Sequence, residues 1–278
     1  MNDIQSAVEI FEKHGIKTRL NENNLIIISH YAQPKGTTFA ELGINEDELI
    51  KNVVACEGLF DARKSQLTTF PLVVSQQITL YDDNNITEMP NLKAVGHFVV
   101  NKKLKKLPKL KAVGSMDLEE SSIKSLPKLK DAGILIVQNS QVKDLSALET
   151  VGKLCIIDSP VQDLKNLKKA EDVFICSSDA EKKIEIKALP ELEEVSKLFV
   201  ANSLLKSLPK LKKAQKLSFS NCQIKSVKAS LKAEFEINDK ITDEELSEKF
   251  DTFTDWYNSE TFQQAMNILG GVVNKIQS

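Results

Sequence analysis

The side chains that could do chemistry are few in this sequence of 278 residues. Metal sites and nucleophilic centres are usually built from histidine, cysteine and closely spaced carboxylates. The three histidines, His14, His30 and His97, have no histidine, cysteine or carboxylate partner at metal-ligand spacing. No glycine-rich phosphate loop, nucleophile elbow or HExxH sequence occurs. We therefore predict no catalytic residue, no metal site and no cofactor, and we expect a protein that is not an enzyme.

The cysteines do not change this prediction, because no two of them form a Cys-x-x-Cys pair. A chain of this length can bury a large core and does not need disulfide bonds to fold. We expect reduced, buried thiols at all four positions, which are Cys56, Cys155, Cys176 and Cys222.

The elements that would position any site come from an internal repeat. Apolar residues at or just before a Leu-Pro step recur at intervals of 19, 18, 19, 19, 19, 25, 19 and 19 residues. They are Phe70, Met89, Leu107, Leu126, Leu145, Leu164, Leu189, Leu208 and Val227. Counted from Val113 as position 1, the apolar positions of one repeat are 1, 4, 6, 11, 14 and 17. The regular period predicts stacked, similar units.

This pattern resembles the leucine-rich repeat over about residues 53 to 232. Position 9, where that family usually has Asn or Cys, is held by Ser121, Ser140, Ser159, Ser178, Ser203 and Cys222. The period of 19 is slightly shorter than the usual 20–29. The resemblance implies a curved parallel sheet lining a concave face, with turns or short helices outside. A serine hydroxyl would replace the usual asparagine amide in the ladder of backbone hydrogen bonds.

Physical reasoning predicts a similar arrangement. Positions 4 and 6 alternate as in a strand, so positions 5 and 7 point to the opposite surface. The proline after position 14 removes a backbone donor and favours a turn. Each unit has one apolar side that only its neighbours can cover. Nine units spaced by about 4.8 Å give a sheet on the order of 40 Å long. The longer interval of 25 predicts a loop around residues 180–183.

Both ends of such an array need caps. Ile4, Phe11 and their neighbours have the spacing of a helix, which Gly15 would end. Residues 16–29 have the pattern of a β-hairpin. Asn45 followed by Glu48 predicts the start of a second helix. We predict an α/β fold with three parts. These are an α/β N-terminal cap at residues 1–52, a leucine-rich-repeat solenoid of about nine repeats at 53–232, and a helical C-terminal cap at 233–278.

Charge is divided unevenly among these parts. Residues 1–55 carry five bases and eight acids (−3), residues 56–232 carry 29 and 21 (+8), and residues 233–278 carry three and ten (−7), which sums to −2. The repeat lysines fall mostly at positions 12, 13, 16 and 18, on the predicted outer side. A Lys-rich face can bind RNA or an anionic membrane. Arginine and interleaved aromatic residues are missing there, so we regard nucleic-acid binding as disfavoured.

Positions 5 and 7 show which part of the concave face could bind a partner. In the central repeats these positions are apolar, although exposed sheet positions are usually polar, and contiguous exposed apolar surface marks an interaction site. The predicted patch consists of Ile136, Cys155, Ile157, Phe174, Cys176, Phe199 and Ala201. Phe174 and Phe199 would be its anchors. The acidic residues Asp117, Glu119 and Glu120 would form an adjoining rim that favours a basic segment.

The predicted function is therefore that of a scaffold that binds another protein or peptide. Two alternatives leave the patch without an outside partner: the C-terminal helix or the 180–187 insertion covers it, or two copies of the chain meet there as a homodimer. A further alternative is an effector of bacterial or mobile-element origin that binds a host protein. The first twenty residues lack an uninterrupted apolar core and no apolar stretch is long enough to span a bilayer, so we expect a cytoplasmic protein.

Overall fold

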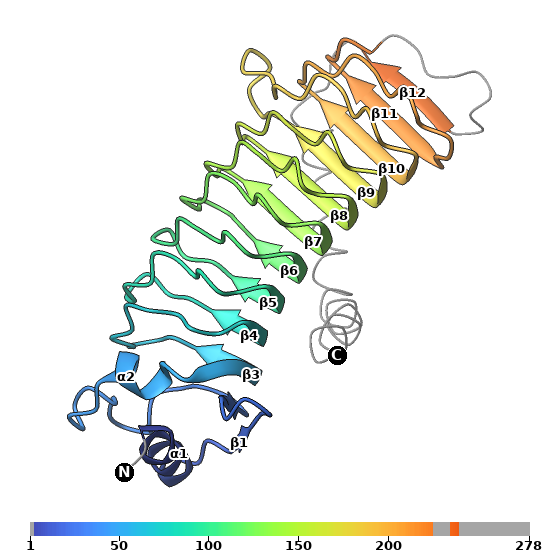
Figure 1. Cartoon of the computed structure of the whole chain (residues 1–278). Helices are drawn as coiled ribbons and strands as arrows, with labels where there is room; N and C mark the ends of the chain where they lie inside the picture. Colours follow the sequence, from blue (N-terminus) through green and yellow to red (C-terminus); the bar gives the residue numbers. More distant parts are fainter. Residues whose placement is uncertain (1–2, 225–233, 239–278) are drawn as a thin grey trace.

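A computed structural model describes residues 3–224 and 234–238, which form a solenoid built around one long sheet (Figure 1). The sheet has twelve strands in sequence order, so each strand pairs with the next one along the chain. The strands are β1 (Thr18–Leu20), β2 (Ile26–Ile28), β3 (Val53–Asp61), β4 (Val74–Thr79), β5 (Ala94–Val99), β6 (Ala112–Asp117), β7 (Asp131–Gln138), β8 (Thr150–Ile157), β9 (Lys169–Cys176), β10 (Glu194–Ala201), β11 (Lys216–Ser220) and β12 (Glu234–Asn238).

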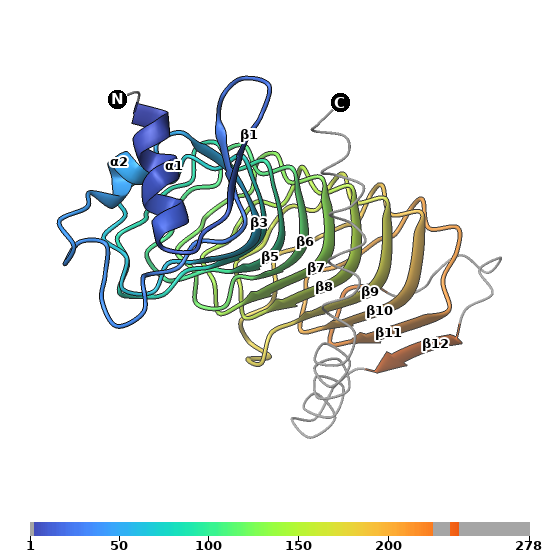
Figure 2. The same ribbon diagram turned by 90° about the horizontal axis from the view of Figure 1, so that it is seen from below.

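From β2 onward every pairing is parallel, and the turns stack one behind another (Figure 2). Leu154 of β8 lies opposite Leu135 of β7 and Val173 of β9, in each case one repeat away. Where the chain enters a strand, Lys130 N donates to Lys111 O and Glu149 N to Lys130 O, both at 2.8 Å. The predicted repeat therefore forms a mostly β, parallel β-solenoid of about nine turns, each about 19 residues long.

The core lies inside the coil, where the predicted apolar positions meet. In the turn that begins with β8, Leu154, Ile156, Val161, Leu164 and Leu167 are all at most 1% exposed. The same positions of neighbouring turns stack on them and form one continuous cluster along the solenoid. Burial of equivalent side chains from adjacent turns is what holds a repeat array together.

A tight turn at positions 8 and 9 follows β6, β7, β8, β10 and β11. Asn139 and Asp158 at position 8 have φ of 47° and 46°, a left-handed conformation that Asn and Asp tolerate best among residues other than glycine. At position 9, Ser159 Oγ lies 2.8 Å from Ile157 O, and Ser140 N donates to this hydroxyl at 3.1 Å. The expected ladder of hydroxyl groups is thus present at these turns.

Ser178 departs from this ladder. Its side chain is exposed, and its hydroxyl donates to Asp158 Oδ2 at 2.8 Å instead of facing the core. The reason is the predicted insertion, because the chain leaves the regular turn at Ser177 and forms the loop that projects between β9 and β10 in Figure 1. Lys183 Nζ at the end of this loop donates to Asn221 Oδ1 at 2.9 Å, which holds the loop against the rim after β11.

The N-terminal end has the predicted elements. Helix α1 (Asp3–Lys13) buries Phe11 in the core and ends before Gly15, whose φ of 77° requires a glycine. Strands β1 and β2 form the antiparallel hairpin. Helix α2 (Glu46–Ile50) begins where Asn45 Oδ1 accepts a hydrogen bond from Glu48 N at 3.3 Å.

A buried carboxylate joins this end to the first turn of the solenoid. Glu46 is 3% exposed, and its carboxylate accepts hydrogen bonds from the Tyr31 hydroxyl, from Gln33 Nε2 at 2.9 Å, from Ser65 Oγ at 2.8 Å and from Gln66 N at 2.9 Å. Burial, and then the nearby Glu46 charge, raise the pKa of Tyr31. These hydrogen bonds offset the cost of burying a carboxylate away from water.

The sheet continues past the predicted boundary at residue 232. Strand β12 pairs in parallel register with β11, with Phe235 opposite Leu217 and Ile237 opposite Phe219. The sequence Glu234-Phe235-Glu236-Ile237 alternates polar and apolar residues, which is the period of a strand and not of a helix. Apart from β12, the helical C-terminal cap predicted for residues 233–278 lies outside the described residues. Among the described residues, no helix has the length and apolar character needed to span a bilayer.

Candidate functional site

The candidate site lies on the exterior sheet face, which we define as the face of the sheet that points away from the core and carries positions 3, 5 and 7. The strand register places the position 5 side chains in one row across the sheet, from Asp117 through Ile136 and Cys155 to Phe174 and Phe199. Gln138, Ile157, Cys176 and Ala201 at position 7 form a parallel row. The two predicted columns are therefore adjacent rows on one face.

The seven predicted patch residues come together as a cluster separate from the main core. Cys155, Ile157, Phe174, Cys176 and Ala201 form its buried part, and Ile136 and Phe199 pack against them half-buried. We call this set the sheet-face cluster. The rings of Phe174 and Phe199 stack with centroids 4.6 Å apart and planes at 16°. Sequence reasoning thus identified the members and their contacts.

The sheet-face cluster is buried more deeply than the preferred interpretation, an exposed binding surface, predicts. Phe174 is 3% exposed and Cys176 is 2% exposed. Of the seven side chains, Ile136 and Phe199 keep intermediate exposure. Cover by another part of the chain was the alternative that the sequence left open, and the projecting loop is held at the rim after β11 through Lys183. The suggested cover by the C-terminal helix involves residues outside the described part of the chain.

The thiols in the cluster are poor nucleophiles. Burial raises the pKa of Cys155 and raises that of Cys176 to about 12, and nearby carboxylates add to both shifts. A cysteine acts as a nucleophile only as a thiolate, so these two are inert near neutral pH. All four cysteines are free. Cys56, Cys155 and Cys176 are buried as predicted, whereas Cys222, near the end of the described turns, is only half-buried.

The acidic rim is only partly available to a ligand. Glu119 and Glu120 are exposed, but Glu120 forms an ion pair with Lys102. Asp117 is half-buried, and burial raises its pKa, although Glu119 N donates to its carboxylate at 2.9 Å and His97 acts in the opposite sense. Burial lowers the pKa of His97, which favours its neutral form. Glu119 is therefore the carboxylate of the rim that is both exposed and outside an ion pair among the described residues.

Position 3 contributes residues that sequence reasoning missed. Lys153 has a side chain that is only 4% exposed, and its Nζ lies 3.8 Å from Asp172 Oδ2 on the adjacent strand. Ile134, in the same row, is fully buried. The alternation of the strand could have indicated these residues, because position 3 lies on the same face of the sheet as positions 5 and 7. A lysine next to an aspartate one repeat later marks a cross-strand pair.

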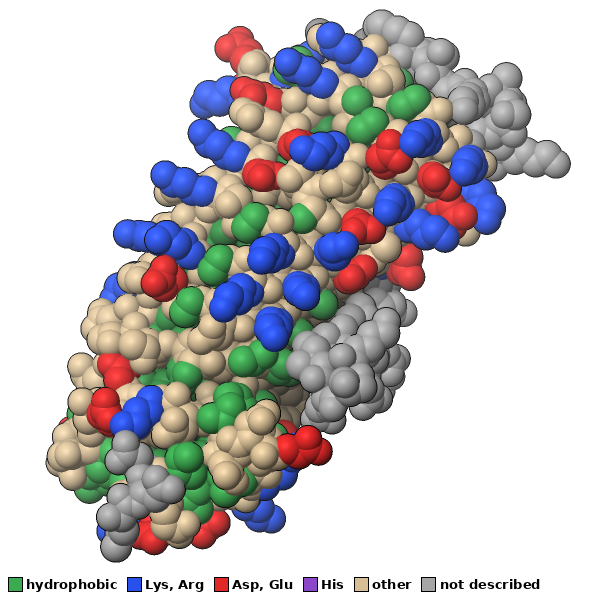
Figure 3. All heavy atoms as spheres, viewed as in Figure 1, with side chains coloured by type: hydrophobic (Ala, Val, Ile, Leu, Met, Phe, Trp, Pro, Cys, Tyr) green, Lys and Arg blue, Asp and Glu red, His purple; other side chains and the backbone are tan. Residues whose placement is uncertain are grey.

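The opposite side of the solenoid, which we call the turn face, carries most of the lysines (Figure 3). Many are neutralised by an acid on an adjacent turn. At position 18, Glu149 accepts from Lys130 at 2.8 Å and from Lys168 at 2.9 Å, which lowers the pKa of Glu149 to about 2. Lys210 pairs in the same way with Glu191 at 2.7 Å at position 16. Exposed pairs of this kind contribute little stability.

Among the described residues, no group of three or more histidine, cysteine or acidic side chains could hold a metal ion.

Comparison of the chain with protein-family models, with curated proteins and with solved structures finds no match. The site has to be interpreted from its own geometry, which offers a row of apolar side chains beside a weakly acidic rim.

Proposed function

We propose that the chain is a non-enzymatic leucine-rich-repeat scaffold that binds a protein or peptide partner on the exterior sheet face, which would be the concave face of such a solenoid. The observation that carries this proposal is the sheet-face cluster. The interior of the coil explains why positions 4 and 6 are apolar, but it places no such demand on positions 5 and 7. A second apolar cluster on the far side of one sheet needs an apolar neighbour.

The chemistry of the partner follows from the cluster and its rim. An apolar side chain would contact Ile136 and Phe199, the two members that keep intermediate exposure. Because five of the seven side chains are already buried, we expect recognition to begin at these two. A basic residue of the partner would lie toward β6, where Glu119 is exposed. Aromatic anchors beside a polar rim are typical of protein interfaces.

The test uses the purified full chain and a displayed library of random peptides. Peptides selected on the native chain are measured by fluorescence anisotropy against Phe199→Asp and against Val99→Asp, a control in the same row on β5 whose side chain is 37% exposed. We expect apolar peptides whose affinity falls at least tenfold with Phe199→Asp and stays unchanged with Val99→Asp. Equal affinity for both variants would show that the sheet-face cluster is not the binding surface.

The rim is tested separately by the rate of association. If Glu119 steers a basic peptide toward the face, the association rate constant falls as salt is raised from low to physiological ionic strength. A rate constant independent of salt would remove the electrostatic part of the proposal and leave the apolar part in place.

A further inference from the structure

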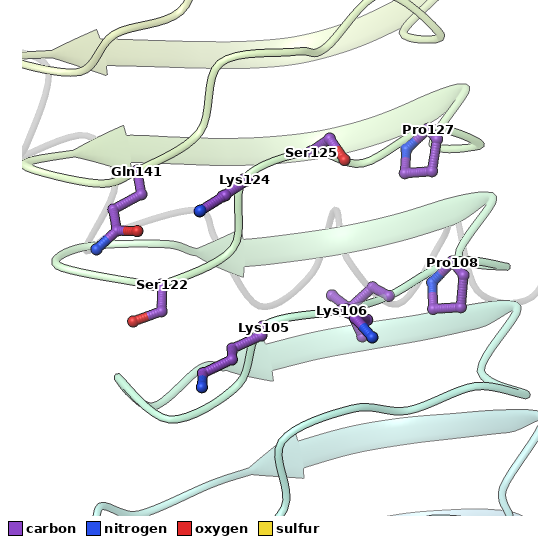
Figure 4. A pocket seen from close by; sticks show the side chains of 9 residues that line it. Lys105, Lys106, Pro108, Ser122, Lys124, Ser125, Pro127 and Gln141 are labelled. Atoms are coloured by element: carbon purple, nitrogen blue, oxygen red, sulfur yellow. The ribbon is translucent and has the colours of Figure 1, made fainter.

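The turn face contains a groove in which two of the three lining lysines, Lys105 and Lys124, form no ion pair within the described residues, whereas Lys106 pairs with Glu88 at 3.5 Å. The groove has a volume of about 700 Å³ and lies between the turn after β5 and the turn after β6 (Figure 4). Lys105, Lys124, Ser122 and Gln141 gather in one half of the groove. In the other half, Pro108 and Pro127 of two Leu-Pro steps lie beside Lys106 and Ser125. The lining residues are Lys105, Lys106, Leu107, Pro108, Ser122, Lys124, Ser125, Pro127 and Gln141.

The column at position 12 differs from the other lysine columns. At positions 16, 18 and 19, the acids Glu149, Glu191, Glu193 and Glu194 form ion pairs with lysines on adjacent turns, as Glu193 does with Lys212 and Glu194 with Lys213. Position 12 has no acid on any described turn, and no ion pair within the described residues involves its lysines. The column is Thr87, Lys105, Lys124, Lys143, Gln162, Lys187 and Lys206.

The backbone opens at the same place. At most places on the turn face neighbouring turns are joined by hydrogen bonds, such as Leu126 N to Asp144 O at 3.3 Å and Lys143 N to Lys124 O at 2.9 Å. The described chain has one other interruption, between residues 162–164 and 187–189, where the insertion separates the two turns. Within the described chain no backbone hydrogen bond joins residues 105–107 to residues 124–126. The N–H groups of Leu107 and Lys124 therefore have no backbone acceptor. The groove is the gap that this interruption leaves.

The two lysines select the ligand. Lys105 and Lys124 lie on adjacent turns and line the same groove, so their long side chains can bring both ammonium groups to the oxygens of one tetrahedral dianion. Ser122 and Gln141 add donors beside them. A nucleic acid would find no aromatic side chain for stacking and no arginine among the lining residues. A free phosphate ion would use the polar half alone, whereas Pro108 and Pro127 offer apolar contact to residues that flank a phosphorylated side chain.

We propose that this groove binds a phosphoserine- or phosphothreonine-bearing peptide, with Lys105 and Lys124 on the phosphate group and the two Leu-Pro steps on the adjoining residues. The site lies on the opposite side of the solenoid from the sheet-face cluster and does not depend on it. The groove gives the chain a second, modification-dependent partner surface.

The experiment measures binding of a fluorescein-labelled peptide, Ala-Leu-phosphoserine-Leu-Ala, to the full chain by anisotropy. The variant Lys105→Ser with Lys124→Ser removes the two central charges. The matched control is Lys187→Ser with Lys206→Ser, because these exposed lysines occupy the same column on adjacent turns but the backbone there is closed, with Lys206 N donating to Lys187 O at 2.9 Å. Both variants change the net charge equally.

We expect the first variant to weaken binding at least tenfold and the control to change it less than twofold, with the unphosphorylated peptide showing no saturable binding. Equal weakening by both variants would overturn the proposal, because any lysine column would then suffice. Inorganic phosphate that competes as well as the phosphopeptide would overturn the peptide assignment. A decameric single-stranded RNA that binds more tightly than the phosphopeptide would overturn the ligand class.

Discussion

Replacing Phe174 with alanine tests whether the sheet-face cluster is part of the fold of the isolated chain. The side chain is 3% exposed and its ring stacks on Phe199 at 4.6 Å. Truncation of a buried phenylalanine to alanine costs about 3–5 kcal/mol, which includes the contacts of an aromatic pair. We expect the lower end, about 3 kcal/mol of unfolding free energy, because Phe199 is only half-buried and can relax toward the space left behind.

The control is Val99→Ala, which truncates a side chain in the same row on β5. Val99 is 37% exposed, so we expect a loss below about 1 kcal/mol. The assay is urea-induced unfolding followed by circular dichroism, in which the free energy is the product of the m-value and the midpoint. Equal m-values show that the comparison concerns stability and not a change in the surface exposed on unfolding.

Equal losses for the two variants would refute the reasoning. They would mean that Phe174 contributes no more to stability than a partly exposed valine, and that the sheet-face cluster is available to an outside partner at little cost. Hydrogen exchange localises the effect, because the amides of β9 and its neighbours lose protection first if the cluster stabilises this part of the array.

Two further predictions concern pH and thiol chemistry. Burial alone would raise the pKa of Asp47, but hydrogen bonds from Thr68 and Thr69 lower that pKa overall. The Asp47 carboxylate therefore stabilises the fold above its unfolded pKa, and this stabilisation is lost as the pH falls through its lower folded pKa. Asp47→Asn should therefore reduce stability by about 1 kcal/mol at pH 7, and the difference should vanish toward pH 2 in urea titrations; a gap that persists there contradicts this account. Burial raises the pKa of every cysteine, so a thiol reagent at pH 8 should modify the native chain slowly, beginning at the half-buried Cys222 and reaching all four thiols in urea; rapid labelling of Cys155 would contradict it.

The fold could be predicted from the sequence because the same pattern of apolar residues recurs in every repeat. Leu154 and Ile156 alternate over too few residues to identify a strand alone, but the same alternation one turn earlier and later fixes both the strand and its register. The predicted register in turn placed the seven members of the sheet-face cluster next to one another on adjacent strands. The position of Ser178 was predicted wrongly because the insertion begins at Ser177, one residue before the serine that the period selects.

The burial of the sheet-face cluster could not be predicted in this way. Periodicity determines the side of the sheet to which Cys155 points, but exposure also depends on what lies next to that side. The same limit applies to Lys153, whose ammonium group is buried beside Asp172 although lysine is usually exposed. Strand register and the direction of each side chain depend on one turn and its two neighbours, and they could be predicted from the sequence. Burial depends also on whatever packs against the exterior sheet face, and it could not.

The net charge of the solenoid shows why the groove stands out from the lysines around it. A sum of +8 over residues 56–232 suggests a uniformly basic surface, yet Glu149, Glu191 and Glu194 each lie about one strand spacing from a lysine and form an ion pair with it. Position 12 has no acid on any described turn, and between Lys105 and Lys124 the backbone hydrogen bonds between the turns are missing as well. At the groove both features coincide with an open cavity, and the stacking of turns requires none of the three.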